Sequence, residues 1–113
     1  MNLQQIGPDI FISAQISIEN IKTLANAGFK TIICNRPDKE DPHQPDFSVI
    51  KTAACEYGIE AYYLPIKPPT IEKSDVETMQ TILKTASLPL LAYCRHGTRS
   101  MHLYQLACFH QFS

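Results

Sequence analysis

The sequence predicts an α/β fold in which a mainly parallel sheet of about four to five strands is flanked by helices. Two observations support this fold class. Short β-prone apolar runs alternate along the chain with segments whose apolar positions repeat every three or four residues. Some of the runs lack polar alternation, as expected of strands that are covered on both faces of a sheet. Because 113 residues allow one domain, we expect residues 1–113 to form a single domain.

The first half of the chain predicts two strands and two helices. Residues 9–13 form a β-prone run, and Ser17 is placed to cap the helix that follows. Gly28 comes just after this helix, where a left-handed backbone turn costs glycine nothing sterically. Residues 31–34 then predict a strand buried on both faces, and a second helix is expected from about residue 47 to residue 57.

The second half repeats this alternation. Residues 59–64 predict a third strand, and the sequence from Ser74 to Glu77 has the spacing of a capping box that opens a third helix. Residues 90–93 predict the last strand. A final helix is expected to begin around residues 98–100, so the chain reads as four strand-and-helix units.

Composition and charge exclude several kinds of partner. A formal net charge of −1 implies no broad basic face, so we expect neither nucleic acid nor membrane as a partner. The amino-terminal residues carry no signal-peptide pattern, which predicts a cytoplasmic protein. The charged fraction of 19% lies below the usual value of about 25%, which suggests an apolar surface patch and makes a homodimer one expectation.

The cysteines and histidines do not predict a metal site or a disulfide. The four cysteines lie far apart and form no Cys-x-x-Cys unit, so reduced thiols are expected. The four histidines have no zinc-ligand spacing, and we expect no metal. Cys34 ends a strand on the same side as Cys94, which makes it a candidate resolving thiol for Cys94.

The segment from Cys94 to Ser100 carries the strongest chemical signal. A buried strand ends at Cys94, a short loop follows, and a helix begins at its end. The loop's backbone N–H groups and the helix N-terminus would bind a tetrahedral anion, and their field would favour the nucleophilic thiolate of Cys94. Arg99 offers a planar fork for two anion oxygens, and Ser100 is expected to donate a hydrogen bond to the sulfur. The expected anion-binding residues are Arg36, Arg95, His96, Gly97, Thr98, Arg99 and Ser100.

This loop resembles the active-site loops of two superfamilies: the cysteine-dependent tyrosine and dual-specificity phosphatases, and the rhodanese sulfurtransferases. Four residues separate Cys94 from Arg99, which is the common rhodanese spacing, whereas phosphatases usually have five. Further motifs separate the two resemblances. The motifs are Ala14–Ser17, Ala27–Ile33, Asn35–Asp38 with Glu40, Gln44 and Pro45, and Tyr93–Ser100. Together they resemble the phosphatase-like domain of the bacterial beta-lactamase hydrolase-like protein family, over about residues 6–109.

This resemblance implies a dual-specificity-phosphatase-like fold and a cysteine-dependent hydrolase that acts on phosphate monoesters, phosphotyrosine among them. Cys94 would form a cysteinyl-phosphate, and Arg99 would bind the phosphate and the transition state. The loop after the third predicted strand lacks the usual acid, so Asp38, with Asp41 as the second choice, is our expected proton donor for the leaving group. Arg36 is expected either to contact the anion or to pair on the surface with Asp38 or Glu40.

Two other functions stay open from the sequence. A rhodanese-type sulfurtransferase would carry a persulfide on Cys94, which the four-residue spacing and the missing acid favour. A catalytically silent module would bind phosphate or sulfate without turnover. In each case the expected ligand is a small phosphorylated or sulfur-containing anion, and no cofactor is expected because a thiolate, backbone N–H groups and an arginine suffice for the chemistry.

Overall fold

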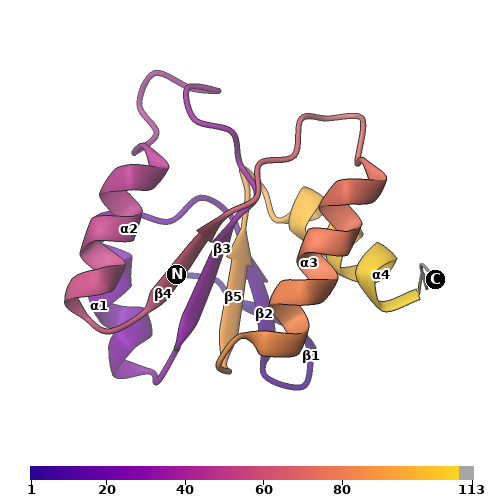
Figure 1. Cartoon of the computed structure of the whole chain (residues 1–113). Helices are drawn as coiled ribbons and strands as arrows, with labels where there is room; N and C mark the ends of the chain where they lie inside the picture. Colours follow the sequence, from indigo (N-terminus) through magenta and orange to yellow (C-terminus); the bar gives the residue numbers. More distant parts are fainter. Residues whose placement is uncertain (110–113) are drawn as a thin grey trace.

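The computed structural model describes residues 1–109 and contains one five-stranded sheet (Figure 1). The strands are β1 (Gln4–Gly7), β2 (Ile10–Ser13), β3 (Thr31–Cys34), β4 (Glu60–Tyr63) and β5 (Leu90–Tyr93). Their order in the sheet is β1-β2-β5-β3-β4, with β1 antiparallel to β2 and the other neighbours parallel. The predicted α/β class with a mainly parallel sheet is therefore confirmed.

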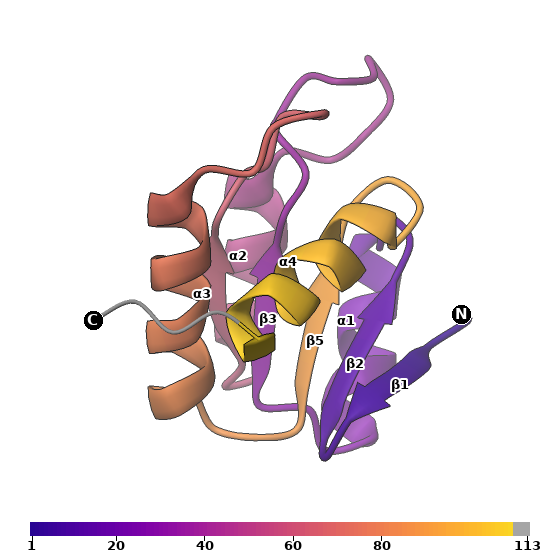
Figure 2. The ribbon, with the colours of Figure 1, turned by 90° about the vertical axis from the view of Figure 1, so that its right-hand side faces the viewer.

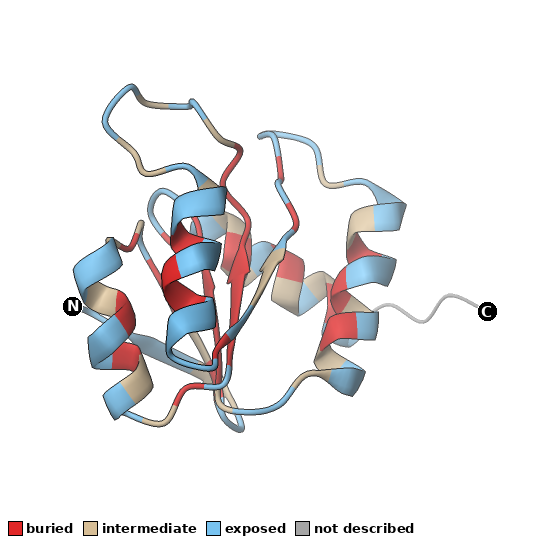
Figure 3. Cartoon of the chain, turned by 60° about the vertical axis from the view of Figure 1, so that its left-hand side comes forward, coloured by how far each residue is buried: buried red, intermediate tan, exposed pale blue. Residues whose placement is uncertain are grey.

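Four helices form the outer layers of the molecule. They are α1 (Ile18–Asn26), α2 (Phe47–Glu56), α3 (Lys73–Thr85) and α4 (Thr98–Phe109). Figures 1 and 2 show α1 and α2 on one face of the sheet and α3 and α4 on the other. This arrangement places β3 and β5, the two central strands, between helices on both sides, and every residue of both strands is buried (Figure 3).

Each face of the sheet has its own apolar core. Ile33 and Leu103 belong to the core under α3 and α4, whereas Ile32 and Ile50 belong to the core under α1 and α2. Successive residues of β3 thus point to opposite cores, as the period of two in a strand requires. The two central strands are almost wholly apolar, so their alternating side chains contribute to both cores.

Replacing Ile33 with alanine is expected to lower the free energy of unfolding by about 2–5 kcal/mol, because Ile33 is fully buried and truncation leaves a cavity. Urea unfolding measures the loss. Val49→Ala on the exposed side of α2 is the control and should change stability by less than about 0.5 kcal/mol. Equal effects of the two substitutions would contradict the placement of Ile33 in the core.

Most predicted elements are found, and three details differ. Helix α1 begins after Ser17, which caps it as expected and exchanges side-chain hydrogen bonds with Asn20. The predicted capping box at Ser74 is wrong: α3 begins two residues earlier, because Glu72 is the N-cap and its backbone N–H is bonded by the Asp75 carboxylate. Strand β1 was not predicted, and β4 is shorter than the expected run of residues 59–64.

Within residues 1–109, no helix is long and apolar enough to cross a membrane. No group of three or more His, Cys, Asp and Glu side chains in that range is arranged to hold a metal ion. The cysteines Cys34, Cys55, Cys94 and Cys108 are free thiols.

Candidate active site

The carboxyl ends of the parallel strands meet at one edge of the sheet, and the loops that follow β3, β4 and β5 all rise from it (Figure 1). Ligands of such sheets bind outside this edge. Strand β5 leads into Cys94, whose backbone N–H faces the Ser13 carbonyl of β2 at 3.4 Å. The loop of residues 94–97 is therefore held between the ends of β2 and β3 before α4 begins at Thr98.

Cys94 lies inside this loop. Its side chain is 1% exposed, and the backbone N–H of Gly97 donates to its sulfur over 3.0 Å. Gly97 has a φ of +94°, a conformation that favours glycine, so the turn that aims this N–H at the sulfur depends on that residue. A donor aimed at the sulfur stabilises the thiolate, which is the nucleophilic form of cysteine.

Asn35 connects the loop to the rest of the edge. The residue is fully buried directly after β3, its side-chain amide donates to the Leu64 carbonyl over 2.9 Å, and its side-chain oxygen accepts from Ser100 Oγ at 2.8 Å. The expectation that Ser100 donates to the Cys94 sulfur is therefore wrong, since its hydroxyl hydrogen bond goes to Asn35. This pair fixes the first turn of α4 to β3, and so fixes where the residues on that turn point.

Arg99 is held by two acceptors that come from two different loops. Its Nη1 and Nη2 atoms contact the two Glu40 carboxylate oxygens at 2.8 and 2.9 Å, and Nη1 also donates to the Ile66 carbonyl over 3.0 Å. These contacts use the two Nη atoms of the guanidinium, and among residues 1–109 no hydrogen bond of its Nε atom is found. The side chain is 14% exposed, so Arg99 is fixed at the mouth of the loop and does not extend into solvent.

Glu40 also binds Arg36, whose Nε lies 3.0 Å from Glu40 Oε1. Arg36 is buried, and its Nη1 donates to the Gln15 side-chain oxygen over 3.1 Å. Of the two expectations for Arg36, pairing with Glu40 is found, but the pair is not on the surface. One carboxylate thus serves two arginines, and the hydrogen bond from Arg99 is the main cause that lowers the pKa of Glu40.

The lowered pKa of Glu40 predicts a change of stability with pH. A carboxylate whose pKa is lower in the folded state stabilises the fold above its unfolded value, near 4.5, and this contribution is lost as the pH falls through the folded pKa. We therefore expect Glu40→Gln to be less stable than wild type at pH 7 by up to about 1 kcal/mol. This difference should shrink below about pH 4.5. Urea unfolding of both proteins across this range is the measurement, and a difference that grows in acid would contradict the assignment.

A cavity of about 610 Å³ opens beside the loop. Its lining includes Arg95, His96, Thr98 and Arg99 from the loop and the start of α4, with Glu40 opposite. Four of the expected anion-binding residues thus share one cavity. Gly97 and Ser100 are buried and are not part of this lining, and Arg36 contacts the lining residue Glu40.

Asp38 and Asp41, the expected proton donors, lie elsewhere. The Asp38 carboxylate accepts the backbone N–H of Phe47 over 2.8 Å at the start of α2, and Asp38 borders a separate cavity with Tyr63. Asp41 accepts the backbone N–H of His43, the main cause that lowers its pKa. Both carboxylates therefore have local structural partners, and this placement favours roles in holding the loop after β3.

Cys34 lies at the adjacent strand end, as expected. Its thiol donates to the Arg36 carbonyl over 3.2 Å, and burial is the main cause that raises its pKa. A raised pKa keeps Cys34 as a thiol, so it is a weaker nucleophile than a thiolate would be. Its use as a resolving thiol stays a prediction.

Sequence reasoning missed the roles of Asn35 and Glu40 toward α4. Both residues belong to a motif that resembles the family. From the sequence, this motif was expected only to lie beside the pocket. A polar residue directly after a continuously apolar strand is a signal that Asn35 must find buried partners. The Glu40–Arg99 pair spans 59 residues in sequence and carries no local signal.

The fold and the site together define the class of this chain: it is a phosphatase-like domain with the fold of the tyrosine and dual-specificity phosphatases. The model of the family described as "Beta-lactamase hydrolase-like protein, phosphatase-like domain" matches residues 2–110. The chain belongs to this family, as its sequence motifs had suggested.

Three relatives illustrate the likeness. The Beta-lactamase hydrolase-like protein of Agrobacterium fabrum strain C58 is 36% identical over 106 residues, which are 94% of this chain and 25% of that protein. A candidate phosphatase from Neisseria meningitidis Z2491, solved as a crystal structure, is 40% identical with a TM-score of 0.82, and the match covers 88% of this chain and 71% of that one. The core catalytic domain of the PP-IP phosphatase SIW14 from S. cerevisiae shares the fold, with a TM-score of 0.72 at 20% identity over 91% of this chain and 62% of that one. The chain spans a quarter of the length of its curated relatives.

Proposed function

We propose that this domain hydrolyses phosphate monoesters, phosphotyrosine among them, through a covalent intermediate on Cys94. The observation that carries the proposal is the arrangement around the sulfur. The Gly97 N–H lies on the Cys94 sulfur, and the Arg99 guanidinium is held by Glu40 and the Ile66 carbonyl at the mouth of the same loop. The 40% identical relative described as a candidate phosphatase supports the phosphatase part of this proposal.

The proposed reaction has two steps. The Cys94 thiolate attacks phosphorus, the sulfur–phosphorus bond forms, and the bond to the ester oxygen breaks and leaves its electron pair on the departing alcohol. Water then attacks phosphorus, releases inorganic phosphate and returns the sulfur as thiolate. Loop N–H groups and the free edge of Arg99 would bind the phosphoryl oxygens, whose charge grows in the transition state.

The supply of the leaving-group proton shapes the expected substrate preference. Among the described residues, Glu40 is the carboxylate that borders the cavity, and its pairing with Arg36 and Arg99 holds it ionised. The contact of Asp38 with Phe47 does not favour it as a donor. The domain should therefore prefer esters whose leaving groups depart without protonation, such as p-nitrophenyl phosphate, over simple alkyl phosphates.

Hydrolysis of p-nitrophenyl phosphate between about pH 5 and pH 8 tests the proposal, with vanadate as an inhibitor that resembles the transition state. We expect turnover that vanadate blocks. A rate no higher than that of buffer would refute it.

Sulfur transfer is the second candidate, and the four-residue spacing between Cys94 and Arg99 favours it. In that reaction the Cys94 thiolate would take the outer sulfur of thiosulfate, release sulfite, and pass the sulfur to cyanide as thiocyanate. Formation of thiocyanate, without hydrolysis of the phosphate ester, would favour this function. If neither reaction occurs and phosphate still raises the melting temperature, the domain is an anion-binding module.

A further inference from the structure

Besides its core-facing side, helix α4 has a partly exposed face that includes two apolar side chains. Leu103 and Ala107 face the core and are buried. The residues on the other face, at successive spacings of three, one and three, are His102, Gln105, Leu106 and Phe109. Phe109 is 82% exposed and Leu106 is half-buried. Leu106 packs in part against the core, whereas the exposed Phe109 gains little from folding, so the core alone does not account for Phe109.

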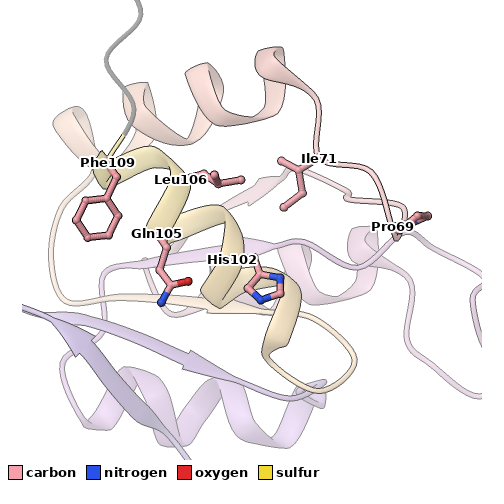
Figure 4. Close-up of a pocket in the computed structure, with 6 residues that line it drawn as sticks. All are labelled: Pro69, Ile71, His102, Gln105, Leu106 and Phe109. Carbon is pink, nitrogen blue, oxygen red and sulfur yellow. The ribbon is translucent and has the colours of Figure 1, made fainter.

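This face forms one wall of a groove. A cavity of about 540 Å³ lies between α4 and the loop that precedes α3, from which Pro69 and Ile71 contribute the other wall. In Figure 4 Leu106 extends from α4 toward Ile71, while His102 lies toward the end of the groove near Pro69. Of the six lining residues, His102 alone has a side chain that can carry a charge.

The groove continues into the cavity of the candidate active site. Pro69, Ile71 and His102 line both spaces. A molecule whose anionic end lies beside Arg99 can therefore extend past His102 and place its other end against Leu106. The two spaces are of the size of ordinary ligand sites, which measure about 300–1,000 Å³.

We propose that this groove binds the organic group of the substrate, and that this group is an apolar ring system larger than a single benzene ring. The inference rests on the proposed phosphatase function and adds the class of ester. The lining chemistry excludes a second phosphate at this position, because the groove offers neither arginine nor lysine to neutralise one. The side-chain amide of Gln105 can form hydrogen bonds with a single polar substituent on this ring system.

The test compares phenyl phosphate with 2-naphthyl phosphate. Both esters release a phenol-type alcohol, so their demand for a proton is similar and they differ mainly in apolar area. We expect wild type to prefer the naphthyl ester in kcat/KM by about tenfold. Leu106→Ser and Phe109→Ser should each reduce this preference severalfold, and hydrolysis of acetyl phosphate, which has no ring to place in the groove, should not change.

Leu88→Ser is the matched control, because Leu88 is also exposed, at 42%, and lies just before β5, at the opposite edge of the sheet. It should keep the full preference for the naphthyl ester. Phe109 makes the test robust, since a side chain 82% exposed can be replaced without unfolding the core. Circular dichroism of each variant confirms the fold.

The outcomes separate the two proposals. If wild type hydrolyses acetyl phosphate but shows no naphthyl preference, or if the variants keep it, the groove inference is overturned and the phosphatase function stands. If no ester is hydrolysed, the function fails. Calorimetric titration then tests the groove inference by itself. The inference predicts that naphthyl phosphate binds more tightly than phenyl phosphate. If Leu106→Ser instead alters the oligomeric state in light scattering and leaves the preference unchanged, the face is a contact between copies of the chain, and the inference is wrong.

Discussion

Replacing Cys94 with serine is expected to lower kcat for p-nitrophenyl phosphate by roughly 10⁴-fold or more, since removal of an enzymatic nucleophile has effects of that order. A serine hydroxyl is a far weaker nucleophile than a thiolate at neutral pH, and no neighbouring base among the contacts of residue 94 activates it. Steady-state rates at saturating substrate measure the loss.

Cys55 provides the matched control for this substitution. It is an exposed free thiol on α2, so Cys55→Ser makes the same chemical change away from the site and should keep wild-type activity. The Cys94 variant should also keep its fold, because the sulfur and the hydroxyl are close in size. Residual activity above about one hundredth of wild type would show that another group is the nucleophile.

Arg99→Lys is expected to lower kcat/KM by about 10²–10³-fold, the usual cost of one lost transition-state donor. Lysine keeps the charge but has no planar fork, so it cannot bind Glu40 through two nitrogens, reach the Ile66 carbonyl and still offer a free edge to phosphate. The same kinetic assay measures the effect, with circular dichroism to check the fold.

Arg95→Lys is the comparison for this second prediction. Arg95 is an exposed residue of the same loop, and its guanidinium has no hydrogen bond to another residue of the described range 1–109, so the same substitution should cost much less there. Similar losses at both positions would mean that the held geometry of Arg99 has no special role, and a small loss at Arg99 would mean that its positive charge alone is enough.

Much of the fold could be predicted because its signals are local. The continuous run at residues 31–34, the Ser17 cap and the glycine after α1 each act within a few residues, and each is found. Strand β1 carries no such signal: its residues are exposed or half-buried, and it forms by pairing with β2. The start of α3 was misplaced because two overlapping capping patterns compete, and Glu72 with Asp75 prevails over Ser74 with Glu77.

The candidate site could be predicted only where its parts are contiguous. Cys94, Gly97 and Arg99 lie on one loop, so the strand-to-helix pattern was enough to bring them together. The partners that orient them, Asn35 and Glu40, come from the loop after β3, and their contacts form only when β3 and β5 pair. Asp38 was expected at the site because its loop follows β3. In the structure its carboxylate instead accepts a hydrogen bond from the backbone N–H of Phe47, at the start of α2.

The covalent intermediate tests the central claim most directly. Wild-type protein is mixed with excess p-nitrophenyl phosphate, quenched within its first turnovers and measured by mass spectrometry, with Cys55→Ser and Cys94→Ser beside it. The account predicts a mass increase of one HPO₃ group, located on Cys94 and missing from Cys94→Ser alone. Steady release of p-nitrophenol with no such adduct on Cys94 in any quenched sample, or an adduct on another residue, would contradict it.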